Sequence, residues 1–232
     1  MADRDRGPER VDAGTNGPFE DGPGSLALAV GLAAAAGAFT ATFRGPRERF
    51  WTRMTWTGAA LGGLALLTSS KSRGARLRLW HLPVGLLSAA ALYLTFQIGD
   101  RFARRFVPGG EAQIHEIYAL RALRPQGEIA TRLATVIGPA EELFWRGLIQ
   151  AALMRRFGRW KGAALAAGAY GGVHVTSGNF TLLGAAGVAG AHWCALYAAG
   201  VPLGALVVSH VAWDIWIFLV QPTGEIEVLA GA

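Results

Sequence analysis

Seven long apolar runs constrain this chain more than any other feature. About 20 predominantly apolar residues are needed for a helix to cross the hydrocarbon core of a bilayer. The runs are continuous rather than alternating, which argues against a β-barrel, and a helix satisfies its backbone hydrogen bonds within one segment. We therefore predict an all-α, polytopic transmembrane helix bundle of about seven spans. The runs lie near residues 25–43, 54–70, 82–99, 129–154, 161–177, 181–199 and 201–220.

The rest of the composition fits one membrane domain with two short tails. Hydrophobic residues make up 52% of the chain and charged residues only 16%, whereas soluble domains carry about a quarter charged residues. Residues 1–24 are rich in Asp, Arg, Gly and Pro, which predicts a disordered N-terminal tail. This leader is long and net acidic, so we expect 25–43 to be a retained span rather than a signal peptide. Residues 25–220 then form the transmembrane domain, and 221–232 a C-terminal tail.

The basic residues indicate a lipid partner rather than a nucleic acid. The net charge is +6, but Lys and Arg gather in the connections between apolar runs, with tryptophans beside them. Such residues anchor spans at the two faces of a membrane. We therefore expect the bilayer as a partner and no nucleic acid. Residues 103–124 are either a basic amphipathic helix on the membrane surface or a solvated loop. The apolar contacts of such a helix would be Phe102, Phe106, Ile114, Ile117, Tyr118 and Leu120.

Small residues predict close helix packing in several runs. Gly58 and Gly62, and likewise Gly168 and Gly172, have the small-xxx-small spacing that lets helices approach in lipid. The tract 184–190 is similar. We assign nearly all of the glycines to packing, because no phosphate-binding fingerprint is present.

The fourth run carries ionisable residues that need an explanation. Each costs about 2.5–3.5 kcal/mol near mid-bilayer on insertion scales. Glu142 and Arg146 are four residues apart and so meet on one helical face. Their pairing leaves Glu141 without a partner on its own helix, as a candidate general base. Gly138 and Pro139 directly precede this pair, so we expect the helix to open there and to admit water beside Glu141.

Two further runs carry matching polar residues. Tyr170 and His174 are four residues apart in the fifth run, as are His210 and Asp214 in the seventh. His192, beside Trp193 in the sixth run, is interpreted as a packing or helix contact. Each pair alone has a structural explanation, as an ion pair or a hydrogen bond between helices. Their joint occurrence in three runs predicts a hydrated cavity for chemistry or transport.

These motifs resemble the CAAX protease and bacteriocin-processing (CPBP, or Abi) family of intramembrane proteases. The family pattern is EExxxR, then FxxxH, then HxxxN or HxxxD, on separate helices. Here EELFWR at 141–146, YGGVH at 170–174 and HVAWD at 210–214 follow in this order. The resemblance covers about 129–220. Tyr170 replaces the usual Phe, and Asp214 replaces the Asn of prenyl-protein members.

The resemblance implies an intramembrane endopeptidase acting on a protein or peptide substrate. Glu141 and His174 would activate the attacking water, and His210 and Asp214 would stand where the family stabilises the oxyanion. Glu142 and Arg146 would brace the site. An ionised Asp would repel an oxyanion, so either Asp214 is protonated or it orients His210 as a carboxylate and His210 alone donates. We favour the second. We expect no required cofactor. The alternative is a catalytic zinc held by Glu141, His174 and His210.

Other functions remain open at this stage. The same polar cluster could serve a proton-coupled transporter, a non-catalytic immunity or scaffold protein, or, less readily, haem ligation by the histidines. The Ala-, Gly- and Arg-rich composition resembles that of a GC-rich bacterium, so we expect a multi-pass protein of a bacterial plasma membrane. Cys194 is the single cysteine, so an intramolecular disulfide is excluded. The sequence sets no oligomeric state.

Overall fold

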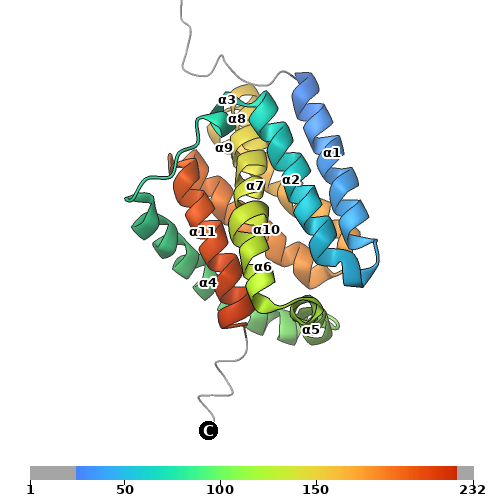
Figure 1. The fold of residues 1–232 in the computed structure, drawn as a ribbon. Coiled ribbons are helices and arrows are strands. Elements are labelled where there is room, and N and C mark those ends of the chain that lie inside the picture. The colour runs from blue at the N-terminus through green and yellow to red at the C-terminus, as the bar shows by residue number, and fades with distance from the viewer. Residues whose placement is uncertain (1–24, 224–232) are drawn as a thin grey trace, which may run out of the picture.

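The computed structural model describes residues 25–223, and nearly all of this segment is helical (Figure 1). The predicted N-terminal tail lies outside the described residues, as does the predicted C-terminal tail except for residues 221–223. The α-helices of the described part are α1 (Ser25–Phe43), α2 (Phe50–Thr68), α3 (Ser70–Arg73), α4 (His81–Phe106), α5 (Gly110–Tyr118), α6 (Gln126–Arg132), α7 (Gly138–Glu142), α8 (Ala151–Phe157), α9 (Arg159–Val173), α10 (Phe180–Ala198) and α11 (Leu203–Ile215).

A helical column made of α6, α7 and α8 runs through the bundle. In Figure 1 it stands between α2 on one side and α11 on the other, with α1 beyond α2 and α4 beyond α11. Helices α9 and α10 pack against each other behind it, and α9 also packs on α8. The short helix α5 lies at the lower end, against α4 and α10. The helices that carry the predicted polar residues, α7, α9 and α11, therefore pack around the same part of the bundle interior.

The central column is widened on both sides of Pro139. Residues Leu133–Ile137 and Leu143–Gln150 are π-helical. Pro139 has no N–H and its ring crowds the preceding turn, and just before it Gly138 N–H donates to the carbonyl of Leu133, five residues back. The predicted opening of the helix is thus a π-helical turn, a feature often found at functional sites.

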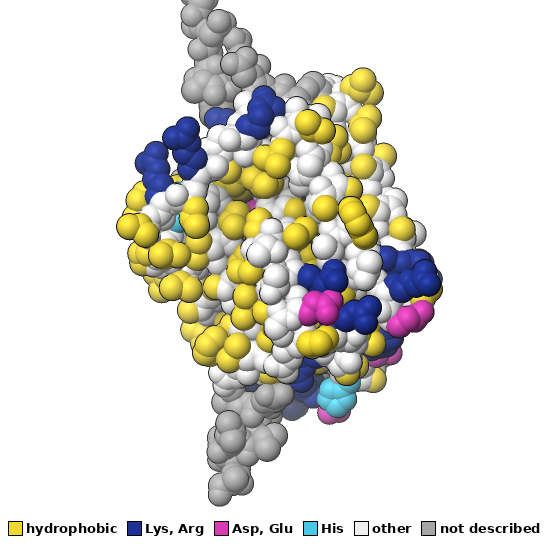
Figure 2. Space-filling view, in the orientation of Figure 1, with side chains coloured by type: hydrophobic (Ala, Val, Ile, Leu, Met, Phe, Trp, Pro, Cys, Tyr) yellow, Lys and Arg dark blue, Asp and Glu magenta, His cyan; other side chains and the backbone are white. Residues whose placement is uncertain are grey.

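Four helical segments of the described part are long and apolar enough to cross a membrane. They are Ser25–Phe43, His81–Phe106, Phe180–Ala198 and Leu203–Val220, the last including a π-helical end. Large apolar side chains on their outer faces are exposed, as lipid contact requires, and Figure 2 shows them spread over one face with basic side chains nearer its ends. The chain is therefore a helical integral membrane protein. The count of seven spans stays a prediction, because α2, the α6–α8 column and α9 do not meet the same criterion.

The two glycine pairs behave differently. A Cβ on Gly62 would lie 2.7 Å from the Cβ of Ala140, and one on Gly58 would lie 3.4 Å from the Cα of Ile137, so this pair does pack α2 against the column. The prediction for Gly168 and Gly172 is wrong. They lie on the exposed side of α9, where a Cβ would meet nothing within 4 Å, while Gly171 faces α10 at Gly187.

The segment 103–124 is mostly helical, but it does not form one surface helix. It comprises the end of α4, the helix α5 and a 3₁₀ turn over Ala119–Leu123. Gly109, with φ of 69°, makes the turn between the two helices. The side chains of Ile114, Ile117 and Tyr118 line an internal cavity. These three side chains face inward against α4 and α10, whereas Phe102 and Phe106 are exposed, so contact of this segment with the membrane surface stays a prediction.

Candidate active site

Glu142 is the centre of a buried polar cluster. Its Oε1 accepts a hydrogen bond from Arg146 Nη1 at 3.0 Å and lies 2.7 Å from His210 Nδ1. The side chains of Glu142 and Arg146 are fully buried, so both charges depend on these contacts. The predicted Glu142–Arg146 pair is confirmed. The contact with His210, which joins α7 to α11, was missed because it lies 68 residues away in sequence.

Glu141 lies beside Glu142 on α7 but faces another partner. Its Oε2 accepts a hydrogen bond from the Tyr170 hydroxyl at 3.0 Å. Tyr170 is buried on α9 between Trp145, which meets it edge-on, and the Arg146 guanidinium, 4.8 Å above its ring. The hydroxyl that Tyr170 adds in place of the usual Phe therefore holds the Glu141 carboxylate.

His174 sits where α9 ends. Its Nδ1 lies 2.9 Å from the carbonyl oxygen of Tyr170. A carbonyl only accepts, so Nδ1 carries the hydrogen, and Nε2 is an acceptor when the ring is neutral. Two aromatic residues of α1, Phe39 and Phe43, pack against the imidazole with centroids 5.1 and 5.6 Å away.

A tight turn fixes the place of His174. The helix ends in a 3₁₀ turn, His174–Ser177, and Gly178 follows with φ of 72°. Asn179 then caps α10, accepting a hydrogen bond from the N–H of Leu182 at 2.8 Å. The Ser177 hydroxyl also donates to the His174 carbonyl at 2.7 Å. These local signals stop α9 at the level of Glu141.

Asp214 lies near the other nitrogen of His210. The distance from His210 Nε2 to Asp214 Oδ2 is 3.5 Å, longer than the Glu142 contact on Nδ1. The predicted pairing of these two residues within α11 is therefore present, but Glu142 makes the shorter contact. The role of Asp214 stays a prediction.

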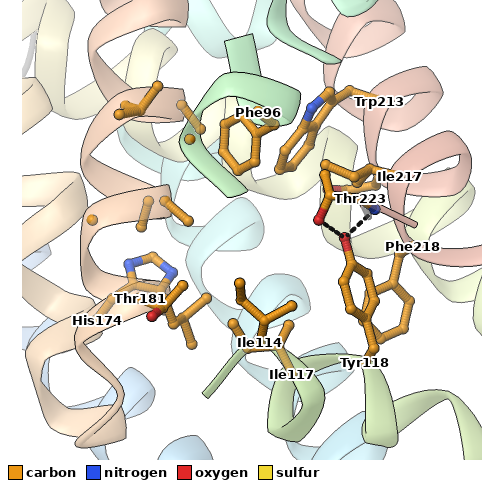
Figure 3. A pocket seen from close by; sticks show the side chains of 18 of the residues that line it. Phe96, Ile114, Ile117, Tyr118, His174, Thr181, Trp213, Ile217, Phe218 and Thr223 are labelled. Carbon is orange, nitrogen blue, oxygen red and sulfur yellow. Dashed lines mark hydrogen bonds between the residues drawn. The ribbon is translucent and has the colours of Figure 1, made fainter. Parts of the chain in front are cut away.

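The candidate residues meet at one cavity of about 670 Å³. Glu141, Tyr170, His174, His210 and Asp214 all contribute to its wall, whereas most of the remaining lining is apolar. In Figure 3, His174 and Thr181 face the cavity from one side, and Phe96 with Trp213 closes another. The cavity thus has side chains capable of proton transfer, two carboxyl groups and two imidazoles, in one part of a mostly apolar wall.

A second polar cluster, not expected from the sequence, closes the opposite side of the cavity. Thr223 donates from its hydroxyl to Asp100 at 2.8 Å. Its N–H donates to the Tyr118 hydroxyl at 3.1 Å (Figure 3). Asp100 also accepts from Arg104 at 2.7 Å. This cluster ties the segment that follows α11 and its π-helical extension to α4 and α5. Only its Asp100–Arg104 pair, four residues apart, has a local sequence signal.

The alternative of a zinc site made by Glu141, His174 and His210 stays a prediction. Within residues 25–223 no group of three or more His, Cys, Asp or Glu side chains is placed to hold a metal ion. His174 directs Nδ1 to a carbonyl and His210 directs Nδ1 to Glu142. A hydrogen bond at Nδ1 leaves Nε2 of the same ring available to another ligand.

Comparison with known proteins identifies the segment that carries these residues. Residues 128–216 match the family model described as type II CAAX prenyl endopeptidase Rce1-like. This segment is similar to the Rce1-like family. The match confirms the resemblance drawn from the three motifs, and the matched range includes every candidate residue from Glu141 to Asp214. The match supports, for this segment, similarity to CAAX-protease-like intramembrane endopeptidases. No curated protein and no solved structure matches the chain.

The cavity also depends on segments outside the Rce1-like match. Phe43 of α1, Phe50 of α2, Phe96 of α4 and Ile114 of α5 all line it. The family segment thus supplies the candidate polar residues, and the preceding part of the chain supplies much of the apolar wall.

Proposed function

We propose that this protein is an intramembrane endopeptidase that hydrolyses a peptide bond in a membrane-associated protein. One observation carries the proposal. Glu141, His174 and His210 come from three different helical segments and reach the same cavity inside a membrane helix bundle. Ionisable groups in such a place are costly and are characteristic of functional sites. The Rce1-like match supports the reaction class.

Glu141 and His174 activate the attacking water in this proposal. Glu141 acts as the general base, and His174 Nε2, left free by the bond from Nδ1 to Tyr170, accepts a hydrogen bond from the same water. The water oxygen bonds to the carbonyl carbon as its proton passes to Glu141. Glu141 then gives this proton to the leaving nitrogen, and the C–N bond breaks to yield an acid and an amine.

His210 stabilises the negative oxygen that forms on the carbonyl. Its Nδ1–H donates to Glu142 and its Nε2–H donates to the oxyanion. Asp214, 3.5 Å from Nε2, orients the ring in the free enzyme. Glu142 and Arg146 lie behind the cavity wall and keep His210 in place.

The cavity favours a substrate that presents its reacting bond beside an apolar group. Exposed residues of α4 and α10, such as Phe102, Val188 and Phe180, belong to the cavity lining and also face outward. A substrate anchored in the bilayer can therefore reach the site from the lipid side. We propose the plasma membrane of a bacterium as its location, and no required metal.

The test uses purified protein in proteoliposomes with Glu141→Ala, His174→Ala and His210→Ala variants. A fluorogenic peptide with a farnesylated cysteine near its C-terminus is the first probe, chosen from the family description. Cleavage by the wild type and loss of at least about 100-fold in each variant is the expected result. Cleavage at the wild-type rate by all three variants would contradict the proposal. Ion or proton flux without any cleavage would favour the transporter instead.

A further inference from the structure

Trp193 of α10 covers one face of the His210 ring. The two ring centroids are 4.0 Å apart and the planes differ by 19°, so the rings are stacked. Trp193 is fully buried and lies outside the cavity lining, on the protein side of His210. It therefore contacts the imidazole without competing for the space that a substrate would occupy.

A chain of hydrogen bonds holds the indole in this position. Trp193 Nε1–H donates to the Ser209 hydroxyl at 3.0 Å. The Ser209 and Ser88 hydroxyl oxygens are 2.8 Å apart, and Ser88 Oγ lies 2.9 Å from His192 Nε2. Ser209 directly precedes His210 on α11, so the indole is fixed relative to the same turn that carries the imidazole. Ser88 extends the connection to α4.

The stack supplies a constraint that the Glu142 contact does not. One hydrogen bond fixes where Nδ1 points, but the ring can still tilt about that bond, because the last torsion of a histidine side chain has a broad energy minimum. The indole face removes this tilt and holds Nε2 toward the cavity. Trp193 also lies 5.2 Å from the Arg146 guanidinium carbon, so it contacts both groups that share Glu142 Oε1.

We propose that Trp193 is a positioning residue for His210, and that Ser209 and Ser88 position Trp193. The inference rests on the proposed function, since it gives the stacked ring a purpose in peptide hydrolysis. The indole face also favours positive charge on the imidazole through a cation–π contact, which assists donation from Nε2.

The kinetic test compares Trp193→Leu, Trp193→Phe and Ser209→Ala on the farnesylated probe. Trp193→Leu removes the stack, and we expect kcat to fall about 100-fold with KM little changed, as a misplacement of about 1 Å does. Trp193→Phe keeps an aromatic face and should recover most of kcat. Ser209→Ala keeps the indole but removes its acceptor, and should lower kcat by less than Trp193→Leu. Wild-type kcat in Trp193→Leu would overturn the proposal.

A spectroscopic measurement separates this proposal from the proposed function. In nanodiscs, proton NMR of ring-labelled histidine should show the His210 ring signals displaced by the stacked indole. The displacement should disappear in Trp193→Leu and persist in the inactive Glu141→Gln variant. An unchanged His210 signal in Trp193→Leu would overturn the positioning role. Full cleavage by Glu141→Gln would instead overturn the proposed function. The His210 ring signal in Trp193→Leu would then still test whether Trp193 positions His210.

A control variant tests whether the loss of an indole by itself disturbs the fold. Trp160 is exposed on α9 and lies away from the cavity lining, so Trp160→Leu removes an indole without touching the site. Its kcat should equal that of the wild type. If Trp193→Leu does not fold, Ser209→Ala decides the matter, and wild-type kcat together with an unchanged His210 signal in that variant would overturn the proposal.

Discussion

His210 Nδ1 lies 2.7 Å from Glu142 Oε1, and this contact links α11 to the central helical column. The same oxygen accepts from Arg146, so one carboxylate connects a candidate catalytic ring to a buried guanidinium. An imidazole held in this way keeps its other nitrogen at the cavity. The site therefore depends on the packing of two helices and not only on residues within one turn of a helix.

Glu142→Ala should destabilise the protein more than the loss of an exposed carboxylate. The change leaves Arg146 buried without its acceptor, which typically costs about 3–5 kcal/mol. Glu128→Ala is the control, because its pair with Arg132 is part exposed and is worth about 1 kcal/mol or less. Thermal unfolding in detergent measures both. Equal loss of stability in the two variants would mean that the buried cluster does not hold the bundle together.

Gly62→Ala should loosen the packing of α2 on α7. The added methyl group would lie 2.7 Å from the Cβ of Ala140, and overpacking of this kind costs about 1–3 kcal/mol. Gly63→Ala is a matched control, since a Cβ at Gly63 meets nothing within 4 Å. The two unfolding midpoints are compared in the same detergent. A Gly62→Ala variant as stable as Gly63→Ala would show that these helices are not in close contact.

Tyr170→Phe should reduce cleavage only partly. The change removes the hydroxyl that donates to Glu141 but keeps the ring that packs on Trp145 and Arg146. Phe is the usual residue at this motif position, so we expect a fall in kcat of less than about 10-fold, against loss of about 100-fold or more in Glu141→Ala. Steady-state kinetics on the farnesylated probe separates these cases. A Tyr170→Phe variant as inactive as Glu141→Ala would make the hydroxyl itself part of the catalytic machinery.

Ionisation of Tyr118 should lower the stability of the protein at alkaline pH. This residue of α5 lies outside the predicted spans, and burial raises the pKa of its phenol above the ordinary value of about 10, despite the hydrogen bonds with Thr223. The folded state thus holds this proton more tightly than the unfolded chain, and stability falls as pH rises above about 10.

The measurement is the unfolding midpoint of the wild type and of Tyr118→Phe from about pH 8 to pH 11. The variant lacks this ionisation, so its midpoint should decline less steeply above about pH 10. Parallel curves for the two proteins would contradict the assignment of the buried phenol.

Local spacing predicted those parts of the site that one helix determines. Glu142 and Arg146 meet because residues four apart share a helical face, and His210 and Asp214 approach each other for the same reason. Glu142 and His210 could not be paired in this way. Their contact depends on how α7 and α11 pack, and both residues already had a local partner in sequence.

Packing faces were predicted with mixed success. Gly58 and Gly62 do face the central column, but Gly168 and Gly172 point outward while Gly171 meets α10. The spacing is the same in both pairs, so spacing alone does not decide which side of an apolar helix has a neighbour. Trp193 shows the same limit, because a tryptophan in an apolar run gives no sign of the ring on which it stacks.

In the proposed mechanism, Glu141 activates water for peptide hydrolysis in the membrane. The most direct measurement compares, by mass spectrometry, the protein termini in membranes of cells that produce either the wild type or Glu141→Gln at equal levels. We expect new termini in membrane-associated proteins with the wild type and their absence with Glu141→Gln. The same new termini in both cell populations would contradict it.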